Sequence, residues 1–207
     1  MNEPQRAALM ALRSNRTNTI YSDLTLRCQG VEFSLHRAIV CPQSGSLRKT
    51  DALSPTRPID EYIFPAATVR RVVLFLYEQC YWWQEDQPSD LPQPAEVFRL
   101  LLMQIDVHTA ALHFEIDALR TCCEQDFIGT LPMIQSSGGS YTLLVDLAEL
   151  IHKIPIRGAI PLWQAVVFAF VRSFGQTFWY TGNEQYWHEN MQRVAFMRDV
   201  NTAIQSM

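Results

Sequence analysis

The sequence predicts an α+β fold, with a small sheet near the N-terminus, helices around it and an all-helical C-terminal part. Residues 24–34 alternate apolar and polar side chains with the period of two that half-buried strands show. From Thr68 onward, apolar residues recur instead at the three-to-four spacing of amphipathic helices. The Gly/Ser-containing stretch Gln135–Ser140 indicates a subdomain boundary ahead of the last helices.

The composition is that of a globular chain that can bury a sizeable core. Its 207 residues are 48% apolar and 11% aromatic, which fits one large domain or one and a half. The net charge is −4, with 17 basic and 21 acidic residues spread without long runs, so we expect no direct nucleic-acid partner. The longest apolar stretch, Leu162–Val171, is shorter than the roughly 20 residues of a spanning helix, so we expect no membrane association.

The cysteines indicate free thiols in a reducing compartment. Their number, five, is odd, and no Cys-x-x-Cys spacing occurs, so neither a disulfide framework nor a zinc site is predicted. Residues 1–16 lack the apolar core of a secretory signal. We therefore expect a location in the cytoplasm or the nucleus.

The first two strands are predicted within Ser22–Cys41. The apolar residues of the first strand, Leu24, Leu26 and Cys28, fall on one face. The alternation resumes at Val31 after Gln29-Gly30, where the glycine can take the positive φ of a hairpin turn. These two strands are therefore predicted to form a β-hairpin.

Short helices are predicted to follow the hairpin. Ser34 is the expected cap of the first, which must end before Pro42. A second brief helix is expected over Gln43–Lys49, and the two prolines within Thr50–Pro58 indicate a loop.

Longer helices follow along the chain. The first, Thr68–Tyr77, carries an apolar stripe and places Arg70 and Arg71 on the other side. The polar stretch Gln84–Pro94 is expected to be an exposed loop, and Asp117 is a predicted cap. The further helices are expected over Ala95–Phe114, Ala118–Thr130, Tyr141–Lys153, Pro161–Phe174 and Tyr186–Ile204.

The stretch Ser22–Cys41 resembles the opening of the BTB/POZ domain. That family begins with a Ser-Asp-hydrophobic strand and a hairpin, and a His-Lys/Arg pair then starts a helix. The residues that match are Ser22, Asp23, Leu24, Phe33, His36, Arg37, Val40 and Ser44. The later residues Leu76, Tyr77 and Tyr81 resemble the family as well, and the likeness extends to about Thr130.

The resemblance implies a BTB/POZ domain over residues 21–130, with a three-stranded sheet flanked by helices. The third strand of the family falls near Ile59–Phe64. Residues 1–20 would form an N-terminal helix or arm, and residues 141–207 a helical extension of the kind that many fungal members carry. The implied function is non-enzymatic protein–protein interaction, with homodimerisation through the N-terminal helix. Because that helix is short, it could instead pack on its own domain.

The candidate binding residues are Asp23, His36, Arg37, Leu47, Leu53, Tyr81, Trp82 and Trp83. In BTB transcription factors, the positions of Asp23 and Arg37 line a charged pocket; alternatively, the two residues form an ion pair that orients the hairpin against the helix. His36 is expected to cap a helix or to hydrogen-bond within the core. The three adjacent aromatic residues indicate either a partner surface or a lid over the core.

Two uses of such a module remain open. The first is a substrate adaptor of a cullin-RING ubiquitin ligase. Members that bind cullin-3 carry an acidic residue two positions after a hydrophobic one in the loop, whereas this chain has Leu53-Ser54-Pro55 and lacks that glutamate. The second is a self-associating scaffold or a transcriptional regulator without its own DNA-binding module.

No catalytic residue, metal site or cofactor is predicted. The chain contains no Gly-x-Ser-x-Gly, phosphate-binding loop or His-Glu-x-x-His motif, and His108 and His113 do not share a helix face. The rival class is a carrier of an apolar ligand. Its pocket would be lined by C-terminal aromatic residues, namely Trp163, Phe168, Phe170, Trp179, Tyr180 and Trp187, although a filled helical core explains them equally.

Overall fold

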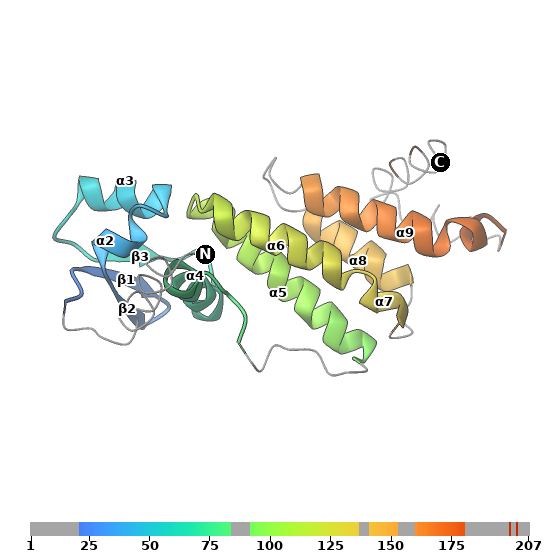
Figure 1. The fold of residues 1–207 in the computed structure, drawn as a ribbon, viewed down its shortest axis with the longest axis horizontal. Coiled ribbons are helices and arrows are strands. Elements are labelled where there is room, and N and C mark those ends of the chain that lie inside the picture. The colour runs from blue at the N-terminus through green and yellow to red at the C-terminus, as the bar shows by residue number, and fades with distance from the viewer. Residues whose placement is uncertain are drawn as a thin grey trace, which may run out of the picture. The chain divides into compact units, whose positions relative to one another are not determined.

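The fold is α+β, as the sequence predicts, with a three-stranded sheet and a larger number of helices (Figure 1). The computed structural model describes residues 21–83, 92–136, 141–152 and 160–180, together with Asp199 and Thr202. The predicted arm 1–20 lies outside the described residues. So do residues 84–91 of the predicted loop, residues 137–140 of the Gly/Ser stretch, and the predicted last helix apart from Asp199 and Thr202. The chain divides into two compact units, Met1–Gln87 with Asp106–Cys123, and Pro88–Ile105 with Glu124–Met207.

The predicted hairpin is confirmed. Strand β1, Leu24–Cys28, pairs antiparallel with β2, Val31–Leu35, in the register that sets Arg27 opposite Glu32. Both turn residues have positive φ, 49° at Gln29 and 79° at Gly30. Two successive positive φ values match the right-handed twist of the strands, which is why a glycine is needed at this turn.

The predicted cap of the first helix is wrong. Ser34 lies in β2, and α2, Arg37–Val40, begins only after His36, whose side chain makes no capping bond. The carboxylate of Asp23 accepts a hydrogen bond from the backbone N–H of Arg37 at 2.8 Å instead. A residue fourteen positions earlier therefore satisfies the first orphan donor of this helix.

The second helix is longer than predicted and begins later. Helix α3 spans Gly45–Leu53, and Ser44 is its cap, with Oγ accepting from the backbone N–H of Leu47 at 3.1 Å. The same hydroxyl donates to the carbonyl of Phe114 at 2.7 Å. Half of the predicted loop Thr50–Pro58 is thus helical.

The third strand is confirmed in a shorter form. Strand β3, Ile59–Glu61, runs parallel to β1, and the sheet order is β2-β1-β3. Helix α4, Ala66–Glu78, follows and ends at Gln79, which has a left-handed φ of 55°. Its Arg71 is only 8% exposed, so the prediction that this residue lies on the outer side is wrong.

Two long helices are confirmed close to their predicted bounds, α5 over Pro94–His113 and α6 over Asp117–Thr130. A short α7, Met133–Ser136, follows and was not expected from the sequence. Then come α8, Tyr141–His152, and α9, Ile160–Tyr180, which is longer than predicted. Among the described residues, no helix has both the length and the apolar character needed to cross a membrane.

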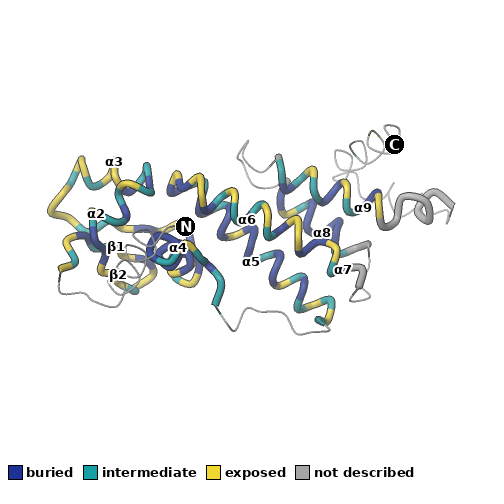
Figure 2. Tube along the Cα trace, in the orientation of Figure 1, coloured by how far each residue is buried: buried dark blue, intermediate teal, exposed yellow. Residues whose placement is uncertain are grey.

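The core of the second unit is built by one face of each of these helices, coloured dark blue in Figure 2. Fully buried residues at its centre include Val97, Leu101, Phe127, Leu162, Val166 and Phe170. In the first unit, Leu24, Leu26 and Cys28 on one face of the sheet are buried, as are α4 residues such as Val69 and Val72. The polar face of the sheet stays exposed.

Candidate interaction surface

The guanidinium of Arg37 joins three separate segments of the first unit. Its Nε donates to Oδ1 and Oδ2 of Asp51, both at 2.8 Å, at the end of α3. One terminal nitrogen lies 3.8 Å from Asp23 Oδ2, just ahead of β1, and the other donates to the carbonyl of Pro55. Arg37 therefore connects the start of the hairpin, helix α3 and the loop that leads to β3.

The side chains of this cluster differ in solvent exposure. The side chain of Asp51 is 15% exposed, that of Arg37 is 29% and that of Asp23 is 52%. The hydrogen bond that Arg37 donates to Asp51 raises the pKa of Arg37, although partial burial of the guanidinium works against it. The structure thus brings the predicted pair Asp23 and Arg37 together as an ion pair, with Asp51 as a closer partner that sequence reasoning missed.

The two candidate leucines lie in different environments. Leu47 is 2% exposed and packs in the core, whereas Leu53, the last residue of α3, is 85% exposed. Leu53 stands between Asp51 and Pro55, which are both held by Arg37. The exposed leucine is therefore carried on a segment that is anchored on either side.

His36 is buried and hydrogen-bonds within the core, one of its two predicted roles, whereas its side chain makes no capping bond. The phenol oxygen of Tyr77 accepts from the backbone N–H of His36 at 3.0 Å and lies 2.9 Å from Nδ1 of its ring. Burial raises the pKa of Tyr77, and the hydrogen bond from the His36 backbone opposes this only in part. This pair fixes the start of α2 against α4.

The three aromatic residues after α4 differ in how far they are buried. Tyr81 is fully buried, and Trp82 and Trp83 are half-buried. The buried Arg71 donates to the carbonyl of Tyr81 at 3.1 Å, and its guanidinium carbon lies 4.2 Å from the centre of the Trp83 ring. Sequence reasoning missed this role of Arg71, whose guanidinium lies at the distance of a cation–π contact from Trp83.

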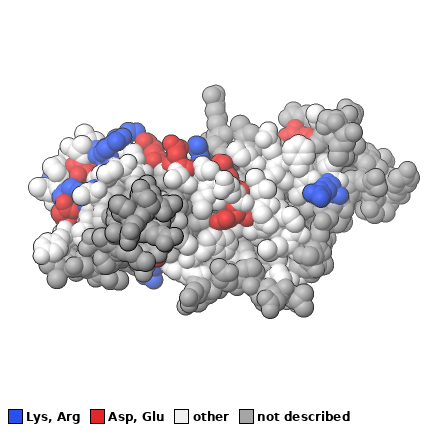
Figure 3. Space-filling view, viewed as in Figure 1, with Lys and Arg blue, Asp and Glu red and all other residues white. Residues whose placement is uncertain are grey.

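Two further polar contacts join the end of α5 and the turn that follows it to the rest of the first unit. Glu61, which is 6% exposed, accepts from the backbone N–H of Ile63 at 2.7 Å and lies 2.9 Å from Nε2 of His113. Lys49 pairs with Glu115 at 2.6 Å. Figure 3 shows Lys and Arg side chains beside Asp and Glu side chains in the part of the molecule that holds α3.

Three or more His, Cys, Asp or Glu side chains do not gather into a possible metal site anywhere in the described ranges. The chemistry of the cluster around Arg37 is that of a structural anchor with an exposed apolar residue, not that of a nucleophile with a base. It is suited to presenting a surface to another protein.

Comparisons with known proteins gave a partial structural likeness. No family model matches the sequence, and no curated protein matches it. Among solved structures, the BTB (Tramtrack and Bric a brac) domain of human gigaxonin is similar to this chain, with 21% sequence identity and a TM-score of 0.44. The match covers 59% of this chain and 92% of that domain.

Proposed function

We propose that this chain is a non-enzymatic protein-interaction module of the BTB/POZ type, which self-associates in the cytoplasm or the nucleus and recruits a partner protein. The main support for the proposal is the arrangement of the residues in Ser22–Cys41 that resemble the BTB/POZ domain. Ser22–Cys41 folds as a β-hairpin, formed by β1 and β2, and the short helix α2. Asp23 and Arg37 meet where the hairpin adjoins this helix. The domain bounds 21–130 and the helical extension 141–207 are part of this proposal.

The exposed Leu53 supports partner recruitment. Complete burial of a leucine side chain contributes about 1.5–3 kcal/mol to association. Because Arg37 binds Asp51 on one side of Leu53 and Pro55 on the other, little conformational freedom is lost when a partner covers it. A rigidly held apolar residue with polar neighbours is typical of an interface anchor.

Self-association is tested by light scattering on the purified full chain. A homodimer has twice the 23.8 kDa mass of the chain at micromolar concentration. A mass of one chain throughout the micromolar range contradicts this part of the proposal. The measurement is independent of any partner.

Partner recruitment is tested by affinity capture followed by mass spectrometry, with cullin-3 as the named candidate of the adaptor hypothesis. The bait is compared with Leu53→Asp and with Ile128→Asp, which places the same charge on another exposed apolar residue, 52% exposed on α6. Capture of cullin-3 that is lost in Leu53→Asp and kept in Ile128→Asp supports the adaptor role. If purified cullin-3 fails to bind the wild-type chain, the adaptor role is excluded and the scaffold or regulator role remains.

The described core favours a scaffold over an apolar-ligand carrier. Phe170 is fully buried among the core side chains of the second unit, and Trp163 packs against them, while Phe168 is exposed. The side chains of Trp179, Tyr180 and Trp187 lie outside the described residues. The aromatic residues that are described thus fill a core or face outward.

A further inference from the structure

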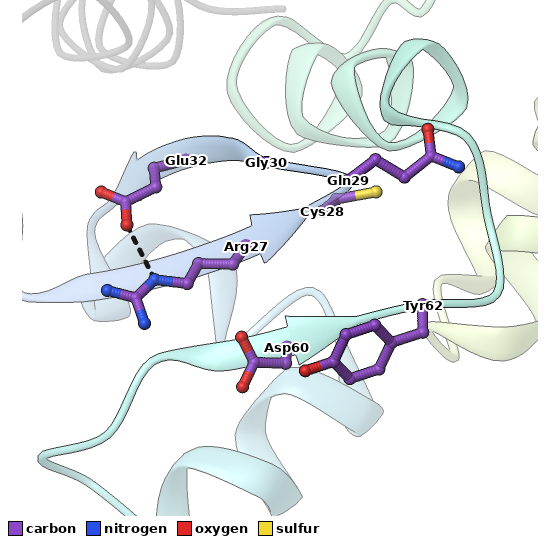
Figure 4. A pocket seen from close by; sticks show the side chains of 7 residues that line it. All are labelled: Arg27, Cys28, Gln29, Gly30, Glu32, Asp60 and Tyr62. Atoms are coloured by element: carbon purple, nitrogen blue, oxygen red, sulfur yellow. Dashed lines mark hydrogen bonds and ion pairs between the residues drawn. The ribbon is translucent and has the colours of Figure 1, made fainter.

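A hollow of about 290 Å³ lies at the end of the sheet, on its polar side, and none of the candidate binding residues lines it. It is formed by the β1–β2 hairpin and by β3, as Figure 4 shows. Its lining residues are Arg27, Cys28, Gln29, Gly30, Glu32, Asp60 and Tyr62. The hollow is therefore a surface separate from the candidate binding residues, with its own charges.

The strand register sets the charges of the hollow. Arg27, on the central strand, stands opposite Glu32 of β2 and opposite Asp60 of β3, so one cation lies between two carboxylates. Arg27 Nε donates to Glu32 Oε1 at 2.7 Å, so the charges of these two side chains offset each other. The side chain of Asp60, by contrast, makes no hydrogen bond or ion pair with any described residue, and only its backbone pairs in the sheet, which leaves the hollow with one spare carboxylate.

An aromatic ring borders the spare carboxylate. Tyr62 follows Asp60 by two positions, its side chain lies beside Asp60 in Figure 4, and it is 81% exposed. The neighbouring Ile63 is 68% exposed. A carboxylate beside an exposed aromatic ring attracts a cation by charge and by the ring quadrupole together.

We propose that this hollow receives an arginine side chain from an extended segment of a partner protein. The guanidinium would pair with Asp60 and lie against the ring of Tyr62, while apolar neighbours in the segment would cover Ile63. An acidic or phosphorylated segment is disfavoured, because the cation Arg27 is already held by Glu32 and Asp60 would repel the anion. The inference adds a second surface to the proposed interaction module, and it holds whether or not the chain self-associates.

The test is an NMR titration of the isotope-labelled full chain with the peptide acetyl-Ala-Val-Arg-Val-Ala-amide. The control peptide carries citrulline, the neutral isostere, at the central position. We expect shifts grouped at residues 27–32 and 59–63 at low-millimolar arginine peptide, and none with citrulline. Binding should weaken as salt is raised, because it depends on charge at an exposed site.

Two substitutions give opposite expectations. Asp60→Asn removes the spare carboxylate and should weaken binding of the arginine peptide at least about five-fold, the size of one favourable charged contact. Arg27→Gln removes the competing cation and frees Glu32, so it should strengthen binding about three-fold. The matched control is Asp146→Asn, which makes the same charge change at an exposed position of α8 and should leave the affinity unchanged.

The outcomes separate this inference from the proposed function. No grouped shifts with the arginine peptide, equal shifts with citrulline, or a loss of binding in Arg27→Gln would each overturn it. Binding of the glutamate version of the peptide in its place would assign the hollow to an anion. None of these results changes the mass measured by light scattering, and a monomeric chain would leave the titration result unaffected.

Discussion

Arg37 holds a partly buried carboxylate, and its removal should cost more than the loss of a surface charge. Arg37→Ala leaves Asp51, which is 15% exposed, without its cation, and we expect the free energy of unfolding to fall by about 2–3 kcal/mol. Arg37→Lys keeps the charge but cannot donate the same fork of hydrogen bonds, so an intermediate loss is expected. Urea denaturation followed by circular dichroism measures both.

The control for this prediction is Arg27→Ala in the same assay. The side chains of Arg27 and Glu32 are 50% and 59% exposed, and exposed ion pairs contribute less than about 1 kcal/mol. If the Arg37 and Arg27 variants lose equal stability, the anchoring role of Arg37 is refuted.

Alkaline pH should destabilise the folded chain. Burial raises the pKa of Cys28, with a contribution from Glu61, and burial also raises the pKa of Cys41 and of Tyr77 above the ordinary values of 9.0 and 10.0. A raised folded-state pKa stabilises the chain fully below the unfolded-state pKa, and this stabilisation is lost as the pH rises through the folded-state pKa.

The free energy of unfolding should therefore fall as the pH rises above about 9, and urea midpoints measured across this range test it. Replacing Cys41 by Ala should flatten the fall, because one of the contributing thiols is gone. A urea midpoint that stays constant up to about pH 10.5, where roughly three quarters of unperturbed phenols and most thiols are ionised, would contradict the expected loss of stability.

At the residue scale, the sequence predicted the ion pair that belongs to a recognisable motif. It did not predict the side-chain contacts that depend on packing. The Asp23–Arg37 pair followed from the motif and its spacing, and the pair is present. Asp51 was missed because its segment was predicted to be a loop. Arg71 was missed because helical spacing does not show when a charged side chain turns inward to meet backbone carbonyls and aromatic rings.

Among the elements, α3 depends on its cap more than on an apolar face. Ser44 is fully buried, accepts from Leu47 and donates to Phe114. Ser44→Ala removes both bonds, and we expect a loss of about 2 kcal/mol in the free energy of unfolding. Thermal denaturation should show a lower midpoint.

Ser46→Ala is the matched control, because it removes the same hydroxyl two positions later on α3. No side-chain hydrogen bond of Ser46 is present in the described structure, so a change within about 0.5 kcal/mol is expected. Equal losses in the two variants would show that the effect comes from helix propensity and not from the cap.

The long amphipathic helices could be predicted because their apolar stripes repeat over several turns. The ends of short elements could not, since a tertiary contact decides them. Helix α3 continues to Leu53 with Leu47 as its one buried residue, and it is stabilised by its docked N-terminus and by Asp51. The strand β2 extends to Leu35 because Leu24 pairs with it, and this removes Ser34 from the helix start.

For the whole molecule, α5 and α6 each contribute residues to both compact units. Loss of one unit would therefore remove helices that the other needs, and we expect a single unfolding transition. Phe170→Ala, at a fully buried position of α9, should lower the free energy of unfolding by about 3–5 kcal/mol. Phe168→Ala, at a position 58% exposed on the same helix, should change it by less than about 1 kcal/mol.

Circular dichroism and tryptophan fluorescence should give coincident transitions for the wild type and for both variants. Trp82 and Trp83 report on the first unit, and Trp163 reports on the second. Two separated transitions, with only one of them shifted by Phe170→Ala, would show that the units unfold independently.

The parallel pairing of β1 with β3 also sets an order of folding events. The hairpin of β1 and β2 closes through a two-residue turn, a step that takes about 1–10 μs in isolated hairpins. The strand β3 can join only after the intervening chain from residue 29 to residue 58, with α2 and α3, has been brought back to the sheet. The hollow between Arg27 and Asp60 is therefore complete only late in folding, and a newly made chain would gain its hairpin before it gains this recognition site.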